Sequence, residues 1–170
     1  PPTASINATL GTIVIGESST LEWSSTNVDS CVIEPGIGSV DPNGSIVVSP
    51  AETILYTITA TGHGGTVSDS STVTVLYPPI VSINATPGTI IIGEAATLEW
   101  NSANADSWTI EPDIGSVDSI GSIVVSPAES TVYTITVTGP GGTATAKASV
   151  AVNYPVPGAG LSVNPEGIVV

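Results

Sequence analysis

The sequence predicts an all-β protein of two tandem antiparallel β-sandwiches, each of about seven strands, followed by a strand-like C-terminal tail. Three observations support this prediction. The chain of 170 residues repeats itself once without a gap. It is 41% hydrophobic and rich in Val, Ile and Thr, which suit a pleated, half-buried surface. No stretch shows the apolar period of a helix.

The internal repeat sets the predicted domain boundaries. "PPTASINATLGTIVIGESSTLEW" begins at Pro1, and "PPIVSINATPGTIIIGEAATLEW" begins at Pro78. The register holds for 77 residues, and about 50 of the aligned positions are identical. We therefore predict one domain at residues 1–77, a second at 78–154, and a Pro/Gly linker and strand at 155–170.

Short runs of alternating polarity, bounded by Gly, Pro, Asn and Asp, predict the strands of each repeat. In the first repeat they are residues 5–8, 12–15, 19–25, 31–34, 45–49, 55–61 and 66–76. Seven short antiparallel strands at this spacing are typical of a sandwich of two sheets.

The alternation also assigns side chains to the core. In "STVTVLY", Val73, Val75 and Tyr77 are expected to point inward, as Leu21 is in "TLEW". The larger predicted core residues are Trp23, Cys31, Tyr56, Trp100, Trp108 and Tyr133.

The single cysteine, Cys31, and the single histidine, His63, raise the possibility of a thiol–imidazole dyad. The repeat argues against it, because the two positions align with Trp108 and Pro140. Cys31 is interpreted as a small buried hydrophobe whose thiol should resist a bulky alkylating reagent. We expect larger residues of the first repeat to fill the space left by the missing indole: Val28, Ile54, Leu55 and Val67.

Charge restricts the classes of partner. Fifteen acidic residues against one basic residue give a net charge of −14, which argues against binding nucleic acid or an anionic membrane surface. No apolar run has the length of a membrane-spanning helix, so we predict no membrane insertion. Most acids recur in both repeats on strand exteriors and turns, where they are interpreted as a solvated coat. Glu111, Asp113 and Asp118 are the best carboxylates for calcium, but no dense calcium-loop signature accompanies them.

Three Asn-x-Ser/Thr sequons offer acceptors for N-linked glycans, at Asn7, Asn43 and Asn84. No catalytic or cofactor-binding residue is predicted. The carboxylates recur too regularly to mark one glycosidase pair, and no orienting third residue accompanies Cys31 and His63.

The motifs "IGE-x-x-TLEW", "GSIVVSP" and "YTIT-x-TG-x-GGT" resemble those of immunoglobulin-like tandem repeats in bacterial and archaeal secreted or cell-surface proteins. The resemblance covers residues 1–154. It implies an extracellular setting and a tyrosine corner in which the Tyr56 hydroxyl bonds to nearby backbone, with Tyr133 as its counterpart. The sequence departs from antibody domains in lacking a disulfide across the sandwich.

These observations favour a non-enzymatic structural protein, a rigid rod of such domains in a surface stalk, sheath or filament. An adhesive or glycan-binding module, and spacer domains of a large secreted enzyme, are the alternatives. The expected partners are neighbouring domains of the chain or other copies of it. The tail at 159–170 has three interpretations: the first strand of a third repeat, a strand donated to another subunit, or a disordered end.

Overall fold

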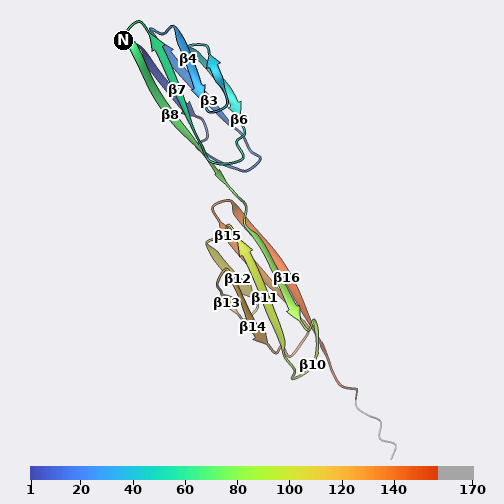
Figure 1. The fold of residues 1–170 in the computed structure, drawn as a ribbon. Coiled ribbons are helices and arrows are strands. Elements are labelled where there is room, and N and C mark those ends of the chain that lie inside the picture. The colour runs from blue at the N-terminus through green and yellow to red at the C-terminus, as the bar shows by residue number, and fades with distance from the viewer. Residues whose placement is uncertain (157–170) are drawn as a thin grey trace, which may run out of the picture.

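The computed structural model describes residues 1–156 and shows two β-sandwich domains joined end to end (Figure 1). Each domain contains eight strands. Those of domain 1 are β1 (Thr3–Ala8), β2 (Thr12–Val14), β3 (Ser19–Thr26), β4 (Ser30–Glu34), β5 (Gly38–Val40), β6 (Asn43–Val48), β7 (Ile54–Gly62) and β8 (Gly65–Leu76). Those of domain 2 are β9 (Ile80–Thr86), β10 (Thr89–Ile91), β11 (Ala96–Ala103), β12 (Ser107–Glu111), β13 (Gly115–Ser116), β14 (Ile120–Val125), β15 (Thr131–Gly139) and β16 (Gly142–Asn153).

Each domain packs a sheet of three strands against a sheet of five. In domain 1 the orders are β1-β3-β6 and β2-β8-β7-β4-β5. Domain 2 repeats them as β9-β11-β14 and β10-β16-β15-β12-β13. The predicted fold class of two tandem immunoglobulin-like sandwiches is confirmed, with the same topology in both halves of the chain.

Two details differ from the prediction. The short strands β5 and β13 were not foreseen, because each spans three residues or fewer between turns. In addition, β2 pairs with β8 in parallel, with Thr12 opposite Thr74, and β10 pairs with β16 in the same way. The reason is that β1 belongs to one sheet and the chain then crosses to the other. There β2 continues in the direction of β1 and lies beside β8.

A tryptophan on the middle strand of the smaller sheet closes one side of each core. The Trp23 indole N–H donates to the backbone oxygen of Asp41 at 2.9 Å, and its ring lies across Gly44 of the neighbouring strand. A Cβ on Gly44 would be 2.7 Å from the ring, which is closer than packing allows. Trp100 and Gly121 repeat this arrangement, which explains the glycine that opens each "GSIVVSP".

Among residues 1–156 there is no helix with the length and apolar character that a membrane crossing requires. The predicted boundary between the domains, after residue 77, falls in the segment that links β8 to β9. The predicted tail strand at 159–170 lies outside the described residues.

Candidate functional site: the joint between the two domains

The joint is a linker of three residues. Leu76 ends β8 and Ile80 begins β9, so only Tyr77, Pro78 and Pro79 connect the two sandwiches. A proline ring holds φ near −65°, which leaves the backbone of this linker few conformations. Figure 1 shows the linker as the narrow neck of an elongated molecule.

Domain 1 holds the linker through Tyr77. Its hydroxyl donates to the backbone oxygen of Ala51 at 2.7 Å, and the side chain is 45% exposed. The prediction that Tyr77 points into the core is therefore wrong. Residue 77 lies one position beyond the end of β8, whose buried alternation finishes at Val75.

Domain 2 holds the same linker through Asn104 and Gly141. The Asn104 side-chain N–H donates to the backbone oxygen of Pro78 at 3.2 Å. Gly141 lies directly under the linker backbone, because an added Cβ would be 2.8 Å from the Pro78 nitrogen. The linker is thus fastened to both domains within two consecutive residues.

The two halves of this joint recur at the ends of the described chain. Asn27 donates to the backbone oxygen of Pro1 at 3.1 Å, as Asn104 does to Pro78. The Tyr154 hydroxyl donates to the backbone oxygen of Ala128 at 2.8 Å, as Tyr77 does to Ala51. The joint is therefore a property of the repeat and not only of this one junction.

The hairpin "TGPGGT" between β15 and β16 receives the linker. A side chain on Gly139 would overlap the backbone oxygen of Asn104, and one on Gly141 would overlap the linker. Gly142 has a φ of 123°, which side-chain-bearing residues rarely adopt. At each of these three positions a residue other than glycine would therefore clash or be strained. Asn104 also lies in the left-handed region, with a φ of 58°.

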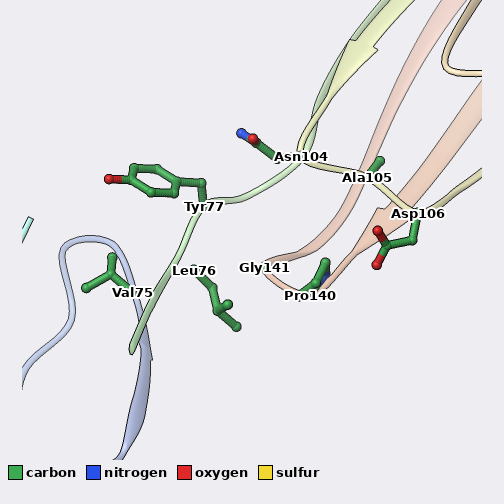
Figure 2. A pocket seen from close by; sticks show the side chains of 8 residues that line it. All are labelled: Val75, Leu76, Tyr77, Asn104, Ala105, Asp106, Pro140 and Gly141. Atoms are coloured by element: carbon green, nitrogen blue, oxygen red, sulfur yellow. The ribbon is translucent and has the colours of Figure 1, made fainter. Parts of the chain in front are cut away.

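A shallow cavity of about 260 Å³ follows the joint (Figure 2). It lies just under the roughly 300 Å³ lower end for ligand pockets. Asp106 is the one carboxylate in its lining, and the hydroxyl of Tyr77 is already bonded to the backbone oxygen of Ala51. The lining therefore supplies no pair of groups for acid–base or nucleophilic chemistry. The lining residues are Val75, Leu76 and Tyr77 from domain 1 and its linker, with Asn104, Ala105, Asp106, Pro140 and Gly141 from domain 2.

Cys31 and His63 have different partners. The Cys31 sulfur lies 3.2 Å from the Ser25 hydroxyl oxygen in a buried site, and the side chain is 2% exposed. The His63 Nδ1 lies 3.2 Å from an oxygen of Asp29 on the surface. The structure therefore gives neither residue the partner that a catalytic dyad needs.

The other predicted core residues lie as follows. Trp23, Tyr56, Trp100 and Tyr133 are each less than 10% exposed, whereas Trp108 is half-buried against the domain 2 core. Among the described residues no hydrogen bond involves the Tyr56 hydroxyl. The prediction of a tyrosine corner at Tyr56 is therefore wrong, and it is Tyr77 that bonds to backbone.

Burial raises the pKa of the Tyr56 phenol above its usual value. Burial also raises the pKa of Tyr133, and the nearby charge of Asp113 raises it further.

The predicted surface sites are placed as follows. Asn7, Asn43 and Asn84 of the three sequons are all exposed. Within residues 1–156 no group of three or more His, Cys, Asp or Glu side chains could hold a metal ion, so the three calcium candidates are not brought together as a site. Those candidates are Glu111, Asp113 and Asp118.

Periodicity does not predict the roles of Asn104, which binds the linker at Pro78, and of its counterpart Asn27, which binds Pro1. A signal is present in "TNVDS" and "ANADS", where Asn, Asp and the following Ser recur while the other two residues change. An asparagine before such a turn can adopt the left-handed conformation and still offer an amide donor.

Comparisons with known proteins agree with the fold. No family model matches the chain. The chain is 33% identical over 130 residues to an uncharacterised protein of Ruminiclostridium cellulolyticum, covering 74% of this chain and 36% of that protein. The chain therefore spans about a third of the length of this relative.

The similar solved structures are tandem immunoglobulin domains. The I67–I69 fragment of titin matches with a TM-score of 0.58 at 17% identity, over 91% of this chain and 66% of the fragment. Extracellular domains 3–5 of Drosophila OTK match with a TM-score of 0.58 at 11% identity, over 90% of this chain and 62% of theirs. At these identities the likeness shows the immunoglobulin-like fold.

Proposed function

We propose that this chain is a stiff two-domain segment of an extracellular structural rod, non-enzymatic, within a stalk, sheath or filament. The observation that carries the proposal is the doubly fastened joint. Tyr77 and Pro78 are consecutive residues, and each is hydrogen-bonded to a different domain. A linker meant to let the domains swing freely would need length and Gly/Ser composition instead.

The repetition of the joint supports an extended assembly of such domains. The Asn27 bond at one end of the described chain and the Tyr154 bond at the other have the geometry of the central joint. The similar titin and OTK structures are likewise fragments with several immunoglobulin domains in series.

The surface supports a rod over the alternative of a glycan-binding module. Sugar sites commonly use exposed aromatic faces, whereas Trp23 and Trp100 are 9% and 7% exposed. The exposed Tyr77 and Tyr154 are each tied by the hydroxyl to a backbone oxygen, that of Ala51 and that of Ala128. The net charge of −14 gives a highly soluble coat and gives similarly charged ligands no attraction.

The test is the distribution of inter-domain distances in solution, measured by small-angle X-ray scattering. The 12 residues of β8 make each domain about 40 Å long at about 3.3 Å per residue, so the chain should scatter as one narrow, extended particle. The double variant Tyr77→Phe with Asn104→Gly removes both fastenings and keeps the backbone conformation at residue 104. Each lost hydrogen bond costs about 1 kcal/mol, so the variant should show a broader distribution.

The matched control is Tyr154→Phe with Asn27→Gly, which removes the equivalent bonds away from the central joint. It should leave the distance distribution unchanged. A broad distribution in the unmodified chain would refute the stiff rod.

A further inference from the structure

The smaller sheet of each domain ends in an open edge at β6 and at β14. The pairing register shows which backbone groups of that edge are free. The Ile6 N–H bonds to a side chain outside the sheet, so Ile6 and Trp23, which lie opposite each other, are a pair that exchanges no backbone hydrogen bonds. Trp23 then bonds to Gly44 on its other side, and the groups of Ser45 and Val47 point outward from β6.

The same register places Ser122 and Val124 on the open edge of β14. The two edges have nearly the same sequence, NGSIVV in β6 and IGSIVV in β14.

Neither edge carries the protection that exposed strands usually have. Charged side chains, prolines and bulges normally prevent edge-to-edge pairing. Both strands are six residues long, free of ionisable side chains and free of proline. Val47 is 64% exposed and Val124 is 66% exposed, so apolar side chains accompany the free backbone groups.

The other sheet edges of the described residues are short or covered. In domain 1 the outward N–H groups of β1 at Ile6 and Ala8 are bonded to the Asp69 and Ser71 side chains. In domain 2 the outer side of β9 lies against β16. The outermost strands of the larger sheets, β2, β5, β10 and β13, have two or three residues each.

We propose that β6 and β14 are lateral pairing sites, at each of which the same edge of a second copy of this chain adds as an antiparallel fourth strand. A second copy of this chain fits each site because its own β6 and β14 are equally free of ionisable side chains, so the two paired strands bring no carboxylate against each other. The carboxylates of Glu22 and Glu99 lie on the next strand inward, opposite Ser45 and Ser122. Antiparallel pairing of an edge with its own copy matches the alternation of its outward N–H and C=O groups.

The positions of the two edges determine the form of the assembly. In Figure 1, β6 and β14 lie on opposite sides of the long axis of the molecule. One chain can therefore pair on both sides at once, and the association does not close at a dimer. The expected product is a ribbon of rods joined side by side. This inference goes beyond the proposed stiffness of the joint and does not depend on it.

The experiment is sedimentation of the intact chain, made without glycosylation so that Asn43 at the start of β6 carries no glycan. The mass of the single chain is 16.9 kDa, and we expect the average mass to rise with concentration past that of a dimer. Val47→Lys should stop the series at a dimer through β14, and Val124→Lys should stop it at a dimer through β6. The double variant should remain monomeric. Lysine on an edge strand leaves the intact sheet bonded but opposes a second strand.

The matched control is Leu55→Lys with Val132→Lys. These side chains are 56% and 52% exposed but lie on β7 and β15, which have neighbours on both sides. The control should associate like the unmodified chain, and so should the Tyr77→Phe, Asn104→Gly joint variant. Far-ultraviolet circular dichroism and thermal midpoints verify that each variant is folded.

A chain that stays monomeric up to about 1 mM would overturn the proposal, since weaker pairing than about 4 kcal/mol builds no assembly. Association that survives the double edge variant would overturn it equally.

Discussion

The two domains have the same fold and similar sequences, so each difference between them can be compared as if it were a substitution. At some positions, a hydrogen-bond donor and its acceptor are replaced together. In domain 1 the Leu10 N–H donates to the buried hydroxyl of Ser19 at 3.1 Å. Domain 2 has Pro87 and Ala96 at these positions, so the donor and the acceptor are both gone. Losing both partners together avoids the cost of one unsatisfied buried polar group.

The second difference keeps a buried serine, Ser25 or Ser102, and changes the side chain that contacts its hydroxyl. In domain 2 the Trp108 indole N–H donates to the Ser102 hydroxyl at 2.6 Å, and Ser102 donates to the Ser119 backbone oxygen. In domain 1 the equivalent Ser25 donates to the Pro42 backbone oxygen at 2.6 Å and contacts the sulfur of Cys31. The serine remains satisfied in both domains, although an indole is replaced by a thiol.

The filling of the space around Cys31 differs from the prediction. Ala60 on β7 lies between Cys31 on β4 and Val67 on β8, opposite both of them in the sheet. Val67 is half-buried, so this valine lies close to Cys31. Leu55 is 56% exposed, and Ile54 is six residues along β7 from Ala60. The prediction that Ile54 and Leu55 fill the gap is therefore wrong.

A third difference has no compensation. The Asp69 and Ser71 side chains that bond to the β1 N–H groups in domain 1 correspond to Ala146 and Ala148. Within residues 1–156 no side chain bonds to the equivalent N–H groups of β9. The start of domain 2 is thus held by fewer polar contacts than the start of domain 1.

Trp108→Cys should cause the largest loss of stability. It places the cysteine of domain 1 in domain 2, where Ala144 stands in place of Val67. Truncating a large aromatic side chain against a core costs about 3 kcal/mol, so the free energy of unfolding of domain 2 should fall by about that amount. Hydrogen exchange followed by mass spectrometry would resolve the two domains in the intact chain. Adding Ala144→Val should recover part of the loss, and no recovery would show that Val67 does not compensate in domain 1.

The second prediction concerns the uncompensated edge. Asp69→Ala should destabilise domain 1 by about 1–2 kcal/mol, since it removes a charge-assisted bond of 2.9 Å to the Ile6 N–H. Faster amide exchange should be confined to β1. The reciprocal change Ala146→Asp should slow exchange in β9, because it offers an acceptor there. Equal exchange rates in β1 and β9 of the unmodified chain would contradict this account.

The repeat and the alternation of polarity predict the fold, because side-chain period and punctuation report strands directly. Leu21, Ile58 and Val73 are fully buried, as their alternation indicated. In the sequence, the joint shows only as two consecutive prolines, Pro78 and Pro79, whose rings fix φ. Its fastenings depend on Tyr77 lying beyond the sheet and on Asn104 meeting Pro78, which lies 26 residues earlier in the chain. Periodicity along one strand carries no information about such contacts.

The smallest expected effect concerns a charge present in one domain. Asp113 corresponds to Gly36, so the repulsion that helps to raise the pKa of Tyr133 is missing at Tyr56. Asp113→Gly should lower the pKa of Tyr133 and leave that of Tyr56 unchanged, as read from tyrosine ring signals in a nuclear magnetic resonance titration. Glycine suits residue 113, whose φ is 65°.

A phenol with a raised pKa in the folded protein contributes stability that is fully present below about pH 10, the value in the unfolded chain. That contribution is lost as the pH rises through the folded value. Asp113→Gly should therefore reduce the free energy of unfolding that domain 2 loses through Tyr133 at alkaline pH. Asp113→Asn, which keeps the shape and removes the charge, should act like the glycine variant. An unchanged pKa of Tyr133 in both variants would show that burial alone raises it.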